Sequence, residues 1–330
     1  MRALFAMPEG LQHHMFSADQ LAGLADLVEI DIETTVPDLG AAPDALLAET
    51  ELLLTGWRSP AVDAAALVRL PRLQRIIHTA GTVRFVVTDA VWERGDIQVT
   101  SATEANAVPV AEFSLAHILL AGKRSLAREA RYRRDHTVGP GTEACDRVGN
   151  YGGVVGLIGA SHIGSLVAEH LRRFDLEVLV TDPFASREQI AALGARKVEP
   201  AELYAASDVV SLHAPDVPST RGMVSRDLLA LLPDGATFIN TARPALVDLD
   251  ALRDELVSGR ISAVLDVHDD LADDDPIWAA AATTITPHIA GSQGNELHRM
   301  GEAAIEEVRR AVTGQPPRFP VDPTLREHSA

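Results

Sequence analysis

The stretch Val154–Asp182, VVGLIGASHIGSLVAEHLRRFDLEVLVTD, decides the fold of this chain. It opens with a short apolar run, Val154–Ile158, which is typical of a buried strand. A glycine-bearing turn follows, and a second strand, Val178–Thr181, ends on Asp182. Between the strands, apolar residues recur at helical spacing at Ile163, Leu166, Val167, Leu171 and Phe174. This is the βαβ order of a dinucleotide-binding unit, where helix N-terminal N–H groups face a pyrophosphate and the acidic residue binds the adenine ribose.

The glycine fingerprint of this turn departs from the usual pattern. G-x-G-x-x-G reads here as Gly159-Ala160-Ser161-His162-Ile163-Gly164, so a serine stands at the middle glycine. That glycine normally lets the backbone approach the phosphates, whereas the serine hydroxyl could itself face a phosphate. The alternative is an α/β turn whose glycines serve packing alone. The flanking strands, the helix and the closing acid favour cofactor binding.

Length and composition narrow the possible classes of protein. A chain of 330 residues predicts two domains, and a net charge of −18 argues against a nucleic-acid surface. The single Cys145 excludes an internal disulfide and fits a reducing cytosol, so we expect a cytoplasmic protein. The apolar run Ala3–Met7 is too short for a signal peptide, and we expect no membrane span and no metal site.

The first hundred residues predict a small α/β domain with a mostly parallel sheet. A capping box at Ser17–Gln20 opens a helix that carries Leu21 and Leu24. Two predicted strands run into Gly56 and Gly81, where such a sheet offers backbone N–H groups to a ligand. The predicted strands are Ala3–Phe5, Val28–Ile30, Leu52–Leu54, Leu73–His78 and Ile97–Thr100.

A single long helix is expected next. It would begin near Asn106 or Pro109 and run through Leu126 into the basic stretch Arg128–Arg134. Arginines at a helix C-terminus complement its dipole, an explanation preferred to an anion site. The glycine-rich segment Thr137–Gly153 reads as a loop.

The second half predicts a doubly wound sheet of six strands. Four further strands are expected at Val209–Leu212, Ala236–Asn240, Ile261–Leu265 and Thr284–Thr286. A helix capped by Ser186 and Gln189 is closed by Gly194, and a helix at Asp250–Ser258 is closed by Gly259. Six special residues stand at or just past the carboxyl ends of strands, and these are Gly159, Asp182, Pro215, Arg243, Asp266 and His288. In a parallel sheet these ends lie along one edge, which is where ligands bind.

That edge combines side chains suited to one reaction. An arginine can clamp a carboxylate, and a histidine can deliver or remove a proton near neutral pH. A nearby carboxylate can orient the imidazole and raise its pKa, and nicotinamide supplies the hydride. Each residue also has an ordinary explanation: Arg243 in a surface ion pair, His288 in a turn, and the acidic stretch 269–275 as a solvated loop. Their joint placement favours the reversible reduction of a 2-keto acid to a 2-hydroxy acid.

Several segments resemble the D-isomer-specific 2-hydroxyacid dehydrogenases. They are NAVPVAEF, GLIGASHIG, LHAPDVPSTRGMVS, FINTARPALVD, VLDVHDD and TPHIAG, and they extend over nearly the whole chain. The resemblance implies two Rossmann-like domains with doubly wound parallel sheets. An NAD-binding domain, residues 102–290, would be inserted into a flavodoxin-like substrate domain, residues 1–101 and 291–330. A homodimer is also implied.

The resemblance implies roles for individual residues. Arg243 would hold the substrate carboxylate and keto oxygen, His288 would be the acid/base, and Asp269 would be its carboxylate partner. Asp182 would bind the adenine ribose and Asp266 the nicotinamide carboxamide. The remaining cofactor residues would be Gly159, Ser161, His162, Ile163, Gly164, Pro215, Thr220, Thr241, Ala242, Arg243, His288 and Gly291. The substrate would be bound by Ala80, Gly81, Thr82, Arg243 and His288.

The chain departs from the family pattern at several points. Pro244 replaces the glycine after the arginine and stiffens that loop. The loop after Asp266 is short, so the family's pairing glutamate falls on Leu271 without a gap and on Asp269 with one. In the loop after Gly81, Val83 and Arg84 stand in place of an acidic residue. Arg84 could favour a substrate with a second anionic group or could simply face solvent.

Two alternative functions stay open. A corepressor-like NAD-binding regulator and an NAD-binding protein without turnover share this fold. Asp182 predicts NAD rather than NADP because its charge would repel a 2′-phosphate, although Arg187 could offset this repulsion. Glyoxylate, hydroxypyruvate, pyruvate and bulkier keto acids are all compatible with the sequence.

Overall fold

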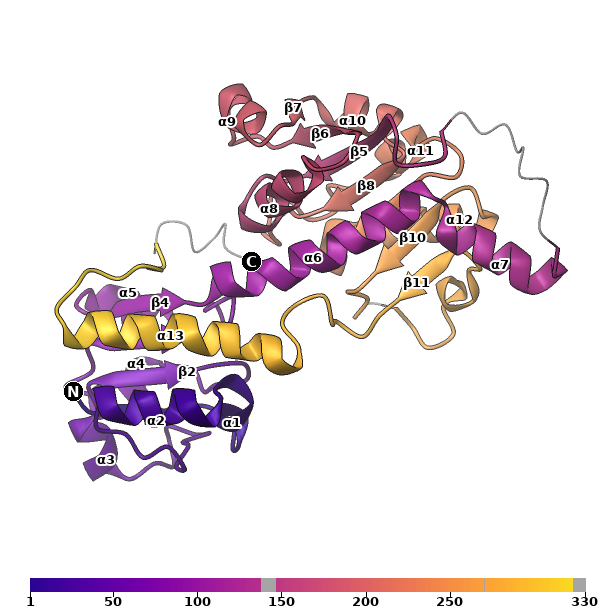
Figure 1. Ribbon diagram of the computed structural model, residues 1–330. Coiled ribbons are helices and arrows are strands. Elements are labelled where there is room, and N and C mark those ends of the chain that lie inside the picture. The colour runs from indigo at the N-terminus through magenta and orange to yellow at the C-terminus, as the bar shows by residue number, and fades with distance from the viewer. Residues whose placement is uncertain (138–146, 270, 323–330) are drawn as a thin grey trace. The chain divides into compact units, whose positions relative to one another are not determined.

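The computed structural model describes residues 1–137, 147–269 and 271–322 (Figure 1). The chain divides into two compact units, Met1–Asn106 with the segment from Ser292 onward, and Ala107–Gly291. The boundaries between the units come after residues 106 and 291, whereas the sequence predicted boundaries after residues 101 and 290. Cys145, and Asp270 of the acidic stretch 269–275, lie outside the described residues.

The first unit contains an all-parallel sheet in the order β1-β2-β3-β4. Its strands are β1 (Ala3–Phe5), β2 (Leu52–Thr55), β3 (Arg75–His78) and β4 (Gln98–Ser101). The prediction of a strand at Val28–Ile30 is wrong. The segment forms only an isolated bridge, between Glu29 and Arg2. Val28 instead ends the preceding helix, where its N–H donates to Leu24 O. The backbone donor of that residue therefore serves the helix C-terminus.

Helices cover both faces of this sheet. On one face α1 (Leu11–Met15), α2 (Ala18–Leu27) and α13 (Leu297–Val312) pack over Phe5 and Leu54. On the other face α3 (Asp44–Glu49), α4 (Ala64–Arg69) and α5 (Asp89–Arg94) pack over Leu4 and Leu53. The predicted capping box at the start of α2 is confirmed: Ser17 Oγ accepts from Gln20 N, and the Gln20 side chain accepts from Ser17 N.

The C-terminal helix α13 belongs to the first unit through close packing. Met300 and Ala304 are buried on the face shared with α2. A Cβ on Gly301 would lie 2.5 Å from Met15 O, so only glycine allows this approach. Gln20 Nε2 adds a hydrogen bond to His298 O of 2.9 Å. A short 3₁₀ helix, η3 (Gly294–Glu296), leads into α13.

The second unit contains a seven-stranded parallel sheet in the order β11-β10-β9-β8-β5-β6-β7. Its strands are β5 (Gly153–Ile158), β6 (Leu176–Thr181), β7 (Arg196–Lys197), β8 (Val209–Leu212), β9 (Thr237–Asn240), β10 (Ser262–Leu265) and β11 (Thr283–Ile285). The six expected strands are present within one or two residues, and β7 is an additional edge strand. The connections reverse direction on either side of β5, which makes its carboxyl end the switch point where such sheets bind ligands.

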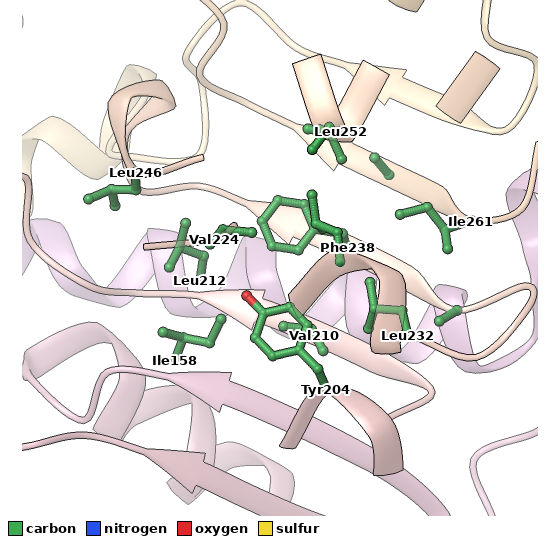
Figure 2. Close-up of a cluster of buried hydrophobic side chains, with 14 of the residues drawn as sticks. Ile158, Tyr204, Val210, Leu212, Val224, Leu232, Phe238, Leu246, Leu252 and Ile261 are labelled. Atoms are coloured by element: carbon green, nitrogen blue, oxygen red, sulfur yellow. The ribbon is translucent and has the colours of Figure 1, made fainter. Parts of the chain in front are cut away.

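Two apolar layers enclose this sheet. One layer joins Ile158, Leu212 and Phe238 of the strands to Tyr204 and Leu252 of the covering helices, as Figure 2 shows. The helices of this face are α10 (Pro200–Ala206), α11 (Arg226–Leu231) and α12 (Leu249–Ser258), with η1 (Pro244–Leu246) and η2 (Pro276–Ala279) in the adjoining loops. The opposite face is covered by α6 (Thr103–Gly122), α8 (His162–Leu171) and α9 (Arg187–Ala192). Phe174, expected on the apolar face of α8, lies beyond its end and is 38% exposed.

The expected single long helix is two helices. α6 begins at Thr103, so Asn106 and Pro109 lie inside it, and Asn106 Oδ1 accepts from Ser292 N instead of capping the helix. At Arg124 the chain takes a left-handed conformation with φ of 50°, and α7 (Ser125–Asp135) follows. The Arg124 guanidinium bonds to Asp234 O, which holds the break in place. No residue of α7 is buried.

No stretch of the sequence was expected to approach the length of a membrane span, and by the criteria of length and composition that expectation is wrong. Within the described part of the chain, α6 is long and apolar enough to cross a membrane. Its Ala111, Ile118 and Ala121 nevertheless pack in the core of the second unit. This packing is that of an ordinary core helix.

Candidate active site

The carboxyl edge of the second sheet carries the predicted residues. Strands β5, β6, β8, β9, β10 and β11 end at Ile158, Thr181, Leu212, Asn240, Leu265 and Ile285. Each is followed within three residues by one of Gly159, Asp182, Pro215, Arg243, Asp266 and His288. All pairings in this sheet are parallel, so residues far apart in sequence lie along the same edge.

The turn after β5 needs glycine at both ends. Gly159 has φ of +95°, and a Cβ there would lie 2.9 Å from His213 O. A Cβ on Gly164 would lie 2.0 Å from Gly159 O. Ser161 is the N-cap of α8, but its hydroxyl makes no capping bond. The helix therefore presents its N-terminal N–H groups beside a hydroxyl that does not cap them, a suitable arrangement for a pyrophosphate.

Asp182 ties this turn to the end of β6. Its Oδ2 accepts from Ala160 N at 2.8 Å, and its Oδ1 accepts from Phe184 N and Ala185 N at 2.7 and 2.8 Å. These bonds orient the carboxylate beside the glycine turn and leave it partly exposed. Arg187 is exposed at the start of α9.

Asp266 anchors the loop after β11. The side chain is 1% exposed, and Oδ1 accepts from Thr286 Oγ1 at 2.6 Å and from Ile289 N at 2.8 Å. Oδ2 accepts from Ala290 N at 2.9 Å. The backbone oxygen of Asp266 also accepts from His288 N at 3.0 Å. Its contacts within the protein thus hold the loop that presents His288.

His288 is exposed in a strained backbone conformation. Its φ of 55° is uncommon for a residue other than glycine, and such conformations cluster at functional sites. Among the described residues, no hydrogen bond or ion pair joins His288 to Asp269. Asp269 is exposed, and its charge instead acts on Arg243. The neighbouring His268 places Nε2 3.1 Å from Thr286 O.

Arg243 is oriented by its backbone loop. Asn240 at the end of β9 accepts from Ala242 N at 2.9 Å and donates to Arg243 O at 3.1 Å, so one side chain holds both sides of the turn. Burial lowers the pKa of Arg243 from its usual value, while the carboxylates of Asp216 and Asp269 oppose that shift. Pro244 fits as the first residue of η1, where no backbone N–H is needed.

Two predicted threonines are occupied by bonds within the protein. Thr220 Oγ1 donates to Pro215 O at 2.6 Å and accepts from Val217 N at 3.0 Å, closing the turn after β8. Thr241 is buried, with its Oγ1 3.2 Å from Ser114 Oγ of α6.

The other predicted cofactor residues differ in exposure. His162 is exposed, Ile163 packs against the apolar layer, and Ala242 and Gly291 are partly exposed. Within the described ranges, no group of His, Cys, Asp and Glu forms a metal site.

His213 is a buried imidazole beside the glycine turn. It follows β8 directly, is 5% exposed, and neither ring nitrogen has a hydrogen-bond partner among the described residues. Burial lowers its pKa to about 4. The backbone of His213 lies against Gly159 and its Cβ lies against Gly164, and an unpaired buried imidazole on this residue fits a site completed by a bound cofactor or water. In the sequence, the placement of His213 at this edge was indicated only by the residues His213-Ala214-Pro215 directly after a buried strand.

The first unit carries a second candidate site after β3. The carbonyl of Ala80 accepts from Ala102 N at 3.0 Å, and that of Gly81 accepts from Thr103 Oγ1 at 2.9 Å. In a trans peptide the N–H points opposite to the C=O, so the following N–H groups face away from these donors. The N–H groups of Gly81, Thr82 and Val83 have no acceptor in the described part of the chain. We call these three groups the anion cradle.

Two arginines lie at the same edge of the first sheet. Arg58 follows β2 with φ of 58°, and Arg84 follows the cradle after the neighbouring β3. Both are exposed, and neither forms an ion pair with another described residue. Sequence analysis identified Arg84 and missed Arg58, whose signal is the WRS sequence after a buried strand.

Known proteins resemble this chain in sequence and fold. Residues 115–290 match the family model "D-isomer specific 2-hydroxyacid dehydrogenase, NAD binding domain". The chain is 31% identical over 94% of its length to D-3-phosphoglycerate dehydrogenase of Mycobacterium bovis, but it spans only 58% of that relative's length. It is also 31% identical to (S)-sulfolactate dehydrogenase of Chromohalobacter salexigens, covering 76% of this chain and 81% of the relative. A solved D-lactate dehydrogenase of Aquifex aeolicus, bound to NAD and lactic acid, is 26% identical with a TM-score of 0.71, covering 95% of this chain and 96% of that chain.

Proposed function

Because the chain belongs to the D-isomer specific 2-hydroxyacid dehydrogenase family, we propose that it is an NAD-dependent enzyme that reversibly reduces a small 2-keto acid to the D-2-hydroxy acid. The proposal rests on one observation: Arg243 and His288 lie at the same carboxyl edge of the second sheet as the glycine turn and Asp182. Residues 115–290 match the NAD-binding domain, and NAD supplies or accepts the hydride when bound.

The proposed chemistry divides between the two cationic side chains. Arg243 binds the substrate carboxylate and polarises the keto oxygen. His288 gives its proton to that oxygen as negative charge develops, and takes it back in the oxidation. Asp269 supports the imidazolium through a bridging water, since no direct bond joins the two residues. It also balances the charge of the partly buried guanidinium of Arg243.

The cofactor residues are assigned by their place along the edge. Gly159, Ser161, His162, Ile163 and Gly164 surround the pyrophosphate, and Asp182 binds the ribose and favours NAD over NADP. The nicotinamide side is formed by Pro215, Thr220, Thr241, Ala242, Asp266 and Gly291. The role of Thr220, Thr241 and Asp266 is to hold their loops, because their side chains already bond within the protein.

The anion cradle and the two nearby arginines support a doubly anionic substrate. Backbone N–H groups without an acceptor in the protein are able to bind a carboxylate, and guanidinium groups bind phosphate or sulfonate. Phosphoglycerate and sulfolactate, named in two of the relatives, each carry such a second anion. We assign the anion cradle and the two arginines of the first unit to substrate binding, and the second unit to NAD binding and to catalysis by Arg243 and His288.

Two further assignments complete the proposal. The family resemblance and the exposed surface of α7, which buries none of its own residues, support a homodimer. We place the enzyme in the cytoplasm, acting on small molecules and on neither nucleic acid nor membranes.

A steady-state assay with NADH tests the proposal directly. The panel contains 3-phosphohydroxypyruvate, sulfopyruvate, hydroxypyruvate, glyoxylate and pyruvate. We expect turnover, with the highest kcat/KM for a doubly anionic keto acid. Nucleotide binding without any turnover would favour a regulatory or inactive NAD-binding protein instead.

The two arginines of the first unit provide a sharper substrate test. Arg84→Ser and Arg58→Ser should each raise the KM for the doubly anionic substrate about tenfold, the loss of roughly one charged hydrogen bond. The KM for pyruvate serves as the internal control and should change less than about twofold. Equal losses for both substrates would refute a second anion site.

A further inference from the structure

The hydroxyl of Thr103 is bonded to the anion cradle. Thr103 is the first residue of α6 and is partly buried. Its Oγ1 donates to Gly81 O at 2.9 Å, a contact between residues 22 apart in sequence. Gly81 O belongs to the same peptide group as the N–H of Thr82, which is one of the three cradle donors. The Thr103 side chain therefore acts directly on a peptide group of the cradle.

The hydroxyl hydrogens at this contact have one arrangement. A carbonyl oxygen can only accept, so the hydroxyl hydrogen of Thr103 goes to Gly81 O. Ser101 Oγ lies 2.8 Å from Thr103 Oγ1. Because the Thr103 hydroxyl has no second hydrogen, it accepts in that contact and Ser101 donates. We call these two consecutive hydrogen bonds, from Ser101 to Thr103 and from Thr103 to Gly81 O, the hydroxyl relay.

Ser101, where the relay starts, is held by the strands beside it. It is the last residue of β4 and pairs with His78 at the end of β3. Its N–H donates to Phe319 O at 3.2 Å. Phe319 N donates in turn to Oε1 of the buried Glu307 of α13 at 2.9 Å. The relay therefore starts from a residue whose backbone is fixed.

The relay sets the direction of the Thr82 N–H. The described part of the chain contains no cis peptide bond, so this N–H points opposite to Gly81 O and away from Thr103. The backbone of Ala102 orients the preceding peptide in the same way, because its N–H donates to Ala80 O at 3.0 Å. Hydrogen bonds in a chain also polarise one another, so the relay makes the Thr82 N–H a stronger donor.

We propose that Thr103 is a positioning residue for substrate: its hydroxyl, oriented by Ser101, holds the Thr82 N–H in the direction that binds the substrate carboxylate. The inference rests on the proposed function, since it takes that carboxylate as the ligand of the cradle. The unpaired groups of a helix N-terminus are N–H donors, which a threonine serves by accepting a hydrogen bond. Thr103 instead donates to a distant carbonyl, so its hydroxyl serves the cradle.

Four variants of the full-length protein separate positioning from the loss of an ordinary hydrogen bond. Thr103→Val keeps the branched shape and removes the relay, Thr103→Ser keeps the hydroxyl, and Ser101→Ala removes only the first bond. Thr50→Val is the matched control, because the buried Thr50 also donates to a carbonyl, Leu46 O, at 2.9 Å. Thr50 precedes β2, so it lies at the amino edge of this parallel sheet, opposite to the cradle.

The expected result is a selective loss of affinity for the keto acid. Thr103→Val should raise the KM about five- to tenfold, the effect of one lost hydrogen bond. Ser101→Ala should raise it about two- to threefold. Thr103→Ser and Thr50→Val should stay within about twofold of the wild type. The Kd of NADH should stay within about twofold in all four variants, because the proposed cofactor residues belong to the other unit.

Oxamate, an unreactive analogue of a 2-keto acid, makes the test independent of turnover. In the wild-type protein it should shift the amide resonances of Gly81 and Thr82, and Thr103→Val should weaken its binding by the same factor as the KM. If the wild-type protein reduces no keto acid, the proposed function fails. The affinities for oxamate then still decide the inference.

Four outcomes would overturn the inference. The first is the absence of amide shifts in the wild type, and the second is an unchanged oxamate affinity in folded Thr103→Val. The third is an equal loss in Thr50→Val or in Thr103→Ser, which would show that the relay has no special role. The fourth is a parallel loss of NADH affinity. If Thr103→Val does not fold, an unchanged oxamate affinity in Ser101→Ala overturns the inference instead.

Discussion

Replacing Asp266 by asparagine should release the loop that carries His288. The carboxylate accepts three hydrogen bonds, two at Oδ1 and one at Oδ2, and it is almost completely buried. An asparagine oxygen can serve Thr286 and Ile289, but its NH₂ group then faces the N–H of Ala290. Two donors are opposed there, and the remaining bonds lose the charge of the acceptor.

The cost follows from these bonds. Hydrogen bonds to a charged group contribute about 1.5–3 kcal/mol each, and a buried donor left unpaired costs about 1–3 kcal/mol. Asp266→Asn should therefore lower the free energy of unfolding of the second unit by about 3–5 kcal/mol, or open the loop locally at lower cost. A misplacement of a catalytic group by about 1 Å can reduce a rate a hundredfold, so kcat should fall by about that factor.

Urea denaturation and amide hydrogen exchange at Ile289 and Ala290 measure the effect. Asp273→Asn is the matched control, since Asp273 is an exposed carboxylate in the loop after β10. The control should behave as the wild type does. If Asp266→Asn unfolds within about 1 kcal/mol of the wild type and its loop amides exchange no faster, Asp266 does not anchor the loop.

Three further predictions concern the site. His288→Ala should lower kcat about a hundred- to ten-thousandfold with little change in NADH affinity. Arg243→Ala should mainly reduce kcat/KM for the keto acid. A near-normal kcat in His288→Ala would mean that another residue transfers the proton. Gly164→Ala should weaken NADH binding at least tenfold, because its Cβ would lie 2.0 Å from Gly159 O. The control Gly23→Ala should leave NADH binding unchanged, because its Cβ would have no atom within 4 Å. Fluorescence titration measures both affinities, and equal values would contradict the close packing of the turn. Burial lowers the pKa of His213 in the folded protein to about 4, from an unfolded value near 6.5. Between these two values the unfolded chain binds a proton that the folded protein does not. The free energy of unfolding is therefore unaffected by His213 above pH 6.5 and falls as the pH is lowered toward 4. The loss should reach about 3 kcal/mol at most, and urea unfolding of His213→Phe should show a weaker pH dependence over that window; an unchanged dependence would mean that the pKa of His213 is the same in the folded and the unfolded protein.

The errors of the sequence analysis occurred where a local signal competed with distant partners. Asn106 has the side chain of an N-cap, yet its Oδ1 bonds to Ser292, 186 residues away in sequence. Val28 and Ile30 have strand propensity, but the backbone there ends α2. Asp269 was identified as the partner of His288 by its place in the acidic loop, and no bond between the two is present among the described residues. That pairing remains a prediction.

Sequence alone determined the α/β class, the glycine turn, the strand ends and therefore the edge that carries Arg243 and His288. These follow from apolar periodicity and from glycines that no other residue could replace, and both are local properties of the chain. Only the tertiary structure decided how the site residues are held: Asn240 holds the turn that carries Arg243, and Asp266 holds the loop that carries His288. Such roles depend on hydrogen-bond partners that folding brings together. A buried polar side chain must find those partners wherever the fold places them, and spacing along the chain does not encode their positions.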